Sequence, residues 1–145
     1  MVIENIQGVI FDMDGTLIDS ELFTEQAVER LLQDNELPTE NVDYKQFYGI
    51  TWKNIEAKLH HLFPALAQKE LAATLQSYFH HMGIEHPPDP IEGSPSAVRE
   101  AGKRMKAAIG TSSNRESLEE VIDQLGIRES LQAAVSAEDY ENSKP

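Results

Sequence analysis

Two carboxylates, a hydroxyl pair and an ammonium group follow three separate apolar runs of the chain. Asp12 and Asp14 alternate after the first run, Thr111 and Ser112 follow the second, and Lys144 lies beyond the third. Carboxylates at this spacing suit a division of labour in which one attacks a substrate and the other moves protons. A divalent cation would neutralise such a cluster. The sequence therefore offers one set of groups for nucleophilic and acid–base chemistry.

The elements that must position these groups are short strands alternating with helices. Residues 8–11, 105–109 and 133–136 are apolar runs typical of strands buried on both faces of a parallel sheet. Helices are predicted between them, with Ser94 and Ser113 as N-caps, Glu116 completing a capping box, and Gly126 as a C-cap. The alternation predicts a parallel α/β core. Ligands bind at the carboxyl ends of such strands, where the reactive groups would converge.

A helical segment interrupts this core. Residues 19–86 contain apolar stripes at helical spacing and no strand signal. Three prolines within residues 87–90 then end the helices. We therefore expect a core formed by residues 1–18 and 87–145, with a helical domain of residues 19–86 inserted after the first strand. Trp52 is expected to belong to the core of that insert.

The composition limits the classes of partner. The chain has 145 residues and a formal net charge of -13, which disfavours nucleic acid and anionic membranes. Any phosphate site must then be built locally from backbone N–H groups, a metal and a few cations. There is no cysteine, no leader-like start and no apolar run long enough for a membrane span. The cytoplasm is the expected compartment.

The motifs resemble those of a known superfamily. Asp12-Met13-Asp14-Gly15-Thr16 after an apolar strand is similar to the first signature of the haloacid dehalogenase superfamily. Thr111 resembles the second signature, and Lys144 in Ser-Lys-Pro resembles the third. The inserted helices resemble the cap of the phosphoglycolate phosphatase and β-phosphoglucomutase branch. The resemblance implies a Rossmann-like parallel sheet with an α-helical cap, and a phosphatase of a small phosphorylated metabolite.

The resemblance also implies a role for each residue. Asp12 would form an aspartyl-phosphate, and Asp14 would protonate the leaving alcohol and later activate water. Mg²⁺ would lie between Asp12, the backbone carbonyl of Asp14 and the phosphate. Thr111 would hydrogen-bond a phosphoryl oxygen, and Lys144 would offset negative charge. The expected phosphate-binding residues are Gly15, Thr16, Thr111, Ser112 and Lys144.

The sequence departs from this pattern at two points. Where β-phosphoglucomutases carry an arginine that grips a second phosphate, residues 49–51 are followed by Trp52, which favours hydrolysis over a mutase reaction. The acidic fourth signature has no counterpart, because the chain ends first. The strand that carries Asp12 would then lie at a bare sheet edge. We therefore expect that the chain either is part of a longer native protein or self-associates through that strand, and that it binds Mg²⁺ poorly because one carboxylate is missing.

Several alternatives stay open. The chain could be a phosphosugar mutase, an inactive fragment that acts as a binding module, or a receiver-type phosphoacceptor domain. Adjacent Asp12 and Asp14 and the inserted helices argue against the receiver. The hydroxyls of residues 111–113 could serve only as helix caps. The pairs His60-His61 and His80-His81 could bind a metal, although helical neighbours point in different directions.

Overall fold

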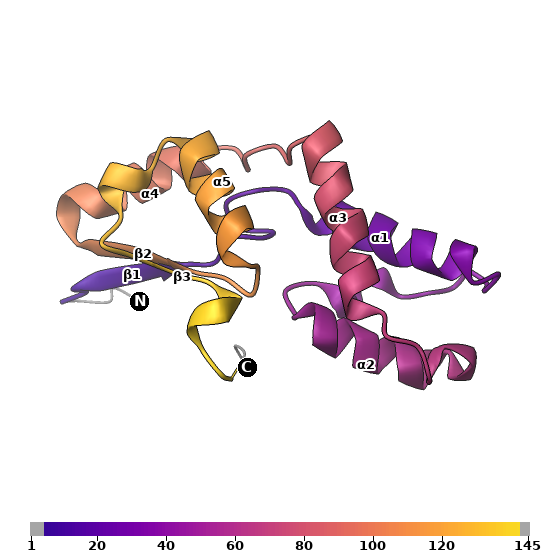
Figure 1. Ribbon diagram of the computed structural model, residues 1–145. Helices are drawn as coiled ribbons and strands as arrows, with labels where there is room; N and C mark the ends of the chain where they lie inside the picture. The colour runs from indigo at the N-terminus through magenta and orange to yellow at the C-terminus, as the bar shows by residue number, and fades with distance from the viewer. Residues whose placement is uncertain (1–4, 143–145) are drawn as a thin grey trace. The chain divides into compact units, whose positions relative to one another are not determined.

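The computed structural model describes residues 5–142, and their contacts divide them into two compact units (Figure 1). Unit 1 joins the chain up to Asp19 with the chain from Asp89 onward, and unit 2 runs from Ser20 to Pro88. These bounds differ by one or two residues from those expected from the sequence. Each unit has its own buried apolar cluster, so each has its own core.

Unit 1 is built on a parallel sheet of three strands. The strands are β1 (Gly8–Phe11), β2 (Lys106–Gly110) and β3 (Ala133–Val135), in the order β1-β2-β3. Phe11 lies opposite Ile109 in the first pairing, and Ile109 lies opposite Ala134 in the second. The predicted parallel α/β fold is confirmed. Both predicted sites of chemistry therefore begin at carboxyl ends of neighbouring strands.

Helices cover only one face of this sheet in the described part of the chain. Helices α4 (Ser94–Arg104) and α5 (Arg115–Leu125) lie on the same side of the strands (Figure 1). Their buried residues pack with Ile109 and Phe11. On the opposite face Ile10 is 77% exposed and Val135 is 39% exposed. The prediction that β1 is buried on both faces is wrong, because residues 5–142 supply no second layer.

Two predicted helix caps are displaced. Gly93 is the N-cap of α4, with φ 81°, and the Ser94 hydroxyl instead donates to the Leu17 carbonyl at 2.7 Å. Asn114 is the N-cap of α5, and its side chain accepts from the Ser117 N–H at 2.8 Å. The predicted caps at Ser94 and Ser113 are therefore wrong, since each hydroxyl has another partner. Gly126 is the C-cap of α5, as predicted.

Unit 2 consists of helices α1 (Glu21–Asp34), α2 (Trp52–Leu62) and α3 (Ala72–Glu85), with 3-10 turns at Tyr44–Phe47 and Pro64–Leu66. The predicted stripes meet in one core that includes Leu31, Ile55, Leu59 and Leu75. Trp52 packs against this core, with its ring 5.3 Å from that of Phe79. Within the described range, no helix combines the length and the apolar character needed to cross a membrane.

The two ends of unit 2 leave unit 1 at neighbouring points. The Asp19 N–H donates to the Asp89 carbonyl at 2.8 Å, and the Ile91 N–H donates to the Leu17 carbonyl at 3.0 Å. Ile18 and Pro90 form an antiparallel bridge between these bonds. Unit 1 is therefore closed by hydrogen bonds at the place where the helical insert begins and ends.

Candidate active site

The turn after β1 is fixed by the methionine between the two carboxylates. Met13 is 1% exposed and belongs to the core of unit 1. Its carbonyl accepts from the N–H groups of Thr16 at 3.2 Å and Leu17 at 2.8 Å. Gly15 has φ 71°, a left-handed conformation that costs glycine little. The buried Met13 and this tight turn hold Asp12 and Asp14 at the carboxyl end of β1.

The loop after β2 carries the hydroxyl side chains. Thr111 is 1% exposed, and its N–H donates to the Val135 carbonyl at 2.9 Å. The Thr111 Oγ1 accepts from the Ser113 N–H at 3.1 Å, which folds the loop back before α5 begins. Residues 111–113 therefore form a compact turn between the end of β2 and helix α5.

Asp14 joins the two loops. Its Oδ2 accepts a hydrogen bond from the Ser113 Oγ at 2.7 Å and a longer one from the Thr111 Oγ1 at 3.3 Å. The Asp12 Oδ1 accepts from the Met13 N–H at 2.9 Å. The structure thus brings together the predicted residues Asp14 and Thr111, with Asp12 two residues away in the same turn. Two hydroxyl donors hold the Asp14 carboxylate in a defined position.

Sequence reasoning assigned Ser113 to a helix cap and missed its contact with Asp14. The available signal was that the side chains of residues 111 and 113 both carry a hydroxyl at the carboxyl end of β2. A serine before a helix has competing partners, and here the carboxylate of Asp14 is the partner. Ser113 therefore belongs to the candidate active site.

The expected phosphate-binding residues differ in their surroundings. Ser112 Oγ is buried and has no hydrogen-bond partner within the described residues. A buried hydroxyl without a partner is costly, and a phosphoryl oxygen could accept from it. The N–H groups of Gly15 and Thr16 already donate inside their own turn, to Ile18 and Met13. Lys144 lies outside the described residues.

The donor atoms near Asp12 and Asp14 are oxygens, which are the ligands that Mg²⁺ prefers. Residues 5–142 contain no group of three or more histidine and acidic side chains placed to hold a metal ion. Mg²⁺ is commonly bound by one or two carboxylates, with water and substrate phosphate as the other ligands. Asp12 and Asp14 fit that pattern in their chemistry.

One histidine of each pair in unit 2 has a local backbone partner. The His60 Nε2 lies 2.8 Å from the Lys69 carbonyl, and the His81 Nδ1 lies 3.1 Å from the Ser77 carbonyl. Neither pair belongs to a metal-binding group in the part of the chain that the structure describes. These contacts favour a structural role.

Comparison with known proteins links this geometry to one family. The family model described as haloacid dehalogenase-like hydrolase matches residues 9–145. A search of curated protein sequences finds no match.

Solved structures share the fold at low sequence identity. One from Bacteroides fragilis, named as a haloacid dehalogenase-like hydrolase, is 14% identical with a TM-score of 0.75, over 97% of this chain and 68% of its own. A predicted phosphoglycolate phosphatase from Haemophilus somnus is 17% identical with a TM-score of 0.69, over 96% and 65%. A hydrolase of the same superfamily from Bacillus subtilis, solved bound to magnesium, is 16% identical with a TM-score of 0.59, over 92% and 66%. The chain spans about two thirds of the length of these proteins.

Proposed function

Because the chain belongs to the haloacid dehalogenase-like hydrolases, we propose that it contains the catalytic groups of a phosphatase that acts on a small phosphorylated metabolite. One observation carries this proposal. Asp14, in the turn after β1, accepts hydrogen bonds from Thr111 and Ser113, in the turn after β2. Carboxylates and hydroxyls gathered at the carboxyl ends of parallel strands match the place where such folds bind ligands.

The first half of the reaction transfers the phosphoryl group to the protein. A carboxylate oxygen of Asp12 attacks phosphorus, and the bond from phosphorus to the ester oxygen breaks. Protonated Asp14 donates its proton to that oxygen, so that an alcohol leaves and Asp14 becomes a carboxylate. The hydroxyls of Thr111 and Ser113, which donate to the Asp14 Oδ2, hold this side chain at the carboxyl end of the sheet.

The second half returns the protein to its starting state. The Asp14 carboxylate takes a proton from a water molecule while the water oxygen attacks the phosphorus of the aspartyl-phosphate. The bond between phosphorus and the Asp12 oxygen then breaks, which releases inorganic phosphate. Asp12 is again ionised and Asp14 is again protonated, so atoms and charges balance over the cycle.

The phosphoryl oxygens would be bound by the loop after β2. Ser112 Oγ is buried and without a partner among the described residues, and Thr111 lies beside it in the chain. Helix α5 begins a few residues later, so its N-terminal partial positive charge also favours an anion. Lys144 would offset the remaining negative charge, as the resemblance implies.

A magnesium ion fits the oxygen donors of this turn. The Asp12 carboxylate and the Asp14 carbonyl would hold it. The Bacillus subtilis protein of similar fold was solved bound to magnesium, which supports the choice of ion. When bound, it would neutralise charge on the phosphoryl group and on Asp12. This neutralisation matters for a chain whose formal net charge is -13.

The phosphosugar mutase alternative has less support. The residue after the loop at positions 49–51 is Trp52, whose partly buried ring packs on Phe79 against the core of unit 2. The uncharged indole ring of Trp52 cannot donate the charged hydrogen bonds that hold a second phosphate. Plain hydrolysis is therefore the proposed reaction.

The decisive experiment measures nitrophenol release from nitrophenyl phosphate with Mg²⁺ and with a chelator, for the protein and two variants. Asp12→Asn should abolish turnover and the binding of beryllium fluoride, since an amide lacks the nucleophilic charge. Asp19→Asn changes charge in the same way on an exposed neighbour and should leave both unchanged. Near-normal turnover by Asp12→Asn, or full turnover with the chelator, would contradict the proposal.

A further inference from the structure

The segment after β3 holds the loop that carries the candidate phosphate-binding residues. The Ala137 N–H donates to the Ser113 carbonyl at 2.9 Å, and the Tyr140 hydroxyl donates to the Thr111 carbonyl at 3.0 Å. The Val135 carbonyl accepts from the Thr111 N–H at 2.9 Å. The backbone of Thr111 is therefore tied at both its N–H and its C=O to the region around the third strand.

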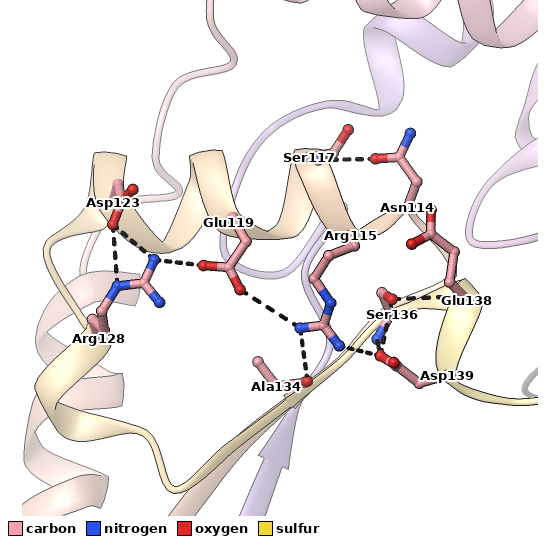
Figure 2. Close-up of polar contacts among 10 residues, drawn as sticks. All are labelled: Asn114, Arg115, Ser117, Glu119, Asp123, Arg128, Ala134, Ser136, Glu138 and Asp139. Carbon is pink, nitrogen blue, oxygen red and sulfur yellow. Dashed lines mark hydrogen bonds and ion pairs between the residues drawn. The ribbon is translucent and has the colours of Figure 1, made fainter.

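That segment has a defined shape of its own. Ser136 is fully buried and caps the 3-10 turn Ala137–Asp139. The Asp139 Oδ2 accepts from the Ser136 N–H at 2.7 Å and from the Ser136 Oγ at 2.9 Å (Figure 2). This capping box fixes the direction in which the chain leaves β3 and presents Ala137 and Tyr140 to the loop after β2.

An arginine at the start of α5 connects this turn to the helix behind the loop. Arg115 donates to the Asp139 carboxylate and, at 3.1 Å, to the Ala134 carbonyl (Figure 2). The N–H and Oγ of Ser136, with Arg115, lower the pKa of Asp139, so the carboxylate stays ionised. Hydrogen bonds thus link Ser136 to Asp139 and Asp139 to Arg115, and Arg115 directly follows the loop and its N-cap residue in the chain. The loop at residues 111–113 is therefore connected to the segment after β3 through the start of α5.

We propose that Tyr140, Asp139 and Arg115 are positioning residues that set the orientation of Thr111, Ser112 and Ser113 for phosphate binding. The inference rests on the proposed function, because it takes phosphate binding as the role of the loop at residues 111–113. Binding and catalysis depend on groups held within about 0.5 Å of their productive places. Each of the three residues acts on the backbone or on the turn beside it.

The partly exposed Arg115–Asp139 pair contributes little to global stability. Their side chains are 36% and 40% exposed, and ion pairs of this kind are weak. Loss of the pair, or of the single Tyr140 hydroxyl, should therefore loosen the loop without unfolding the unit. Local mobility and global stability can then be measured separately.

The first test compares two tyrosine variants of the chain. Tyr140→Phe removes the donor to Thr111, whereas Tyr44→Phe removes a similar hydroxyl donor to the Thr39 carbonyl, 3.1 Å away in unit 2. In Tyr140→Phe, amide hydrogen exchange at residues 111–113 should rise by about 3- to 10-fold, as expected for one hydrogen bond. The affinity for inorganic phosphate should fall by a similar factor, with the melting temperature and Mg²⁺ affinity unchanged. Tyr44→Phe should change neither exchange nor phosphate affinity.

The second test uses the carboxylate. Asp139→Asn should repeat the effect of Tyr140→Phe, and Asp139→Glu should restore phosphate affinity because glutamate also completes a capping box. Lys103→Gln, which removes an ion-pair partner of Glu100 on helix α4, is the matched control and should have no effect. Unchanged exchange at residues 111–113 in both Tyr140→Phe and Asp139→Asn would overturn the positioning role. Raised exchange in a chain that never binds phosphate would instead reject the proposed function.

Discussion

Asp12 and Asp14 flank Met13, whose side chain is buried in the core of unit 1. This arrangement means that any shift of the core at Met13 would also move both carboxylates. Asp14 is further restrained by Ser113, so its position depends on two loops at once. The position of Asp14, the proposed proton donor, therefore depends on Ser113, which lies about a hundred residues away in the sequence.

Asp14→Asn tests the role of the second carboxylate. An asparagine can still accept from Ser113, but it cannot donate a proton to a leaving oxygen. Turnover should fall by about 10²- to 10⁴-fold for alkyl phosphates and less for nitrophenyl phosphate, whose leaving group needs no proton. Steady-state rates for both substrates provide the measurement. Equal losses would show that Asp14 does not protonate the leaving group.

The contact between Asp14 and Thr111 could be anticipated from the sequence because both residues follow apolar strands. Parallel strands bring such positions to one edge of the sheet. Ser113 could not be assigned in the same way, since a serine before a helix has a capping option and a carboxylate option. Only the fold places the Asp14 side chain within reach.

At the scale of elements, the N-terminus of helix α3 is capped by a carboxylate from helix α2. Glu56 of α2 accepts from the N–H groups of Leu71 and, at 2.9 Å, Ala72. These bonds lower the pKa of Glu56 below its ordinary value. A lowered folded-state pKa stabilises the fold above the unfolded-state pKa, and this contribution disappears as the pH falls through the folded-state value.

Glu56→Gln should therefore destabilise the chain by about 1 kcal/mol at neutral pH, the usual contribution of a helix N-cap, and less if solvent weakens the contact. The difference from wild type should shrink in acid, where Glu56 itself is protonated. Urea unfolding at both pH values measures it, with Glu40→Gln as an exposed control. A difference that grows in acid would contradict the capping role.

Two helical glycines should respond in opposite ways to alanine. A Cβ at Gly102 in α4 would lie 2.5 Å from the Ser130 carbonyl oxygen, whereas one at Gly83 in α3 would meet nothing within 4 Å. Gly102→Ala should destabilise by about 1–3 kcal/mol because a backbone atom must move. Gly83→Ala should be neutral or stabilise by up to about 1 kcal/mol. Thermal unfolding of both variants measures the two changes in stability. A loss of stability in Gly102→Ala alone would show that close packing, rather than helix propensity, requires glycine at residue 102.

The positions of strands and helices followed from apolar periodicity, whereas their exact ends did not. Residues 8–11 match β1, and Gly126 ends α5 as expected. Ser94 has the sequence of an N-cap, but its hydroxyl finds the buried carbonyl of Leu17. Because Ser94 is buried, its hydroxyl needs a partner, and the Leu17 carbonyl, which also accepts from the Ile91 N–H, has a second lone pair for it. No local sequence pattern reveals that carbonyl.

At the scale of the molecule, one face and one edge of the sheet are open in residues 5–142. Strand β1 pairs only with β2, and Ile10 is 77% exposed. Edges of this kind recruit other strands. We therefore propose that β1 pairs either with a further strand of a longer protein or, in the 145-residue chain alone, with β1 of a second copy.

Sedimentation of the chain over a range of concentrations tests this proposal. The wild type should show a concentration-dependent dimer, and Ile10→Lys should shift it to monomer, because lysine on an edge strand discourages pairing. Leu22→Lys alters an exposed leucine of α1 and should leave the dimer intact. A monomeric wild type would contradict association through β1.

The hydrogen bond from Asp19 to Asp89 has a consequence for how the architecture could change. Hydrogen bonds between residues 17–19 and residues 89–91 hold the two ends of the insert together. The conformational entropy lost when unit 1 folds therefore depends only weakly on the length of the segment between these ends. Loop-closure cost grows only logarithmically with length, so the junction tolerates exchange of the whole helical segment. A different domain could therefore replace the helical insert at this junction while the Asp14, Thr111 and Ser113 cluster keeps its geometry.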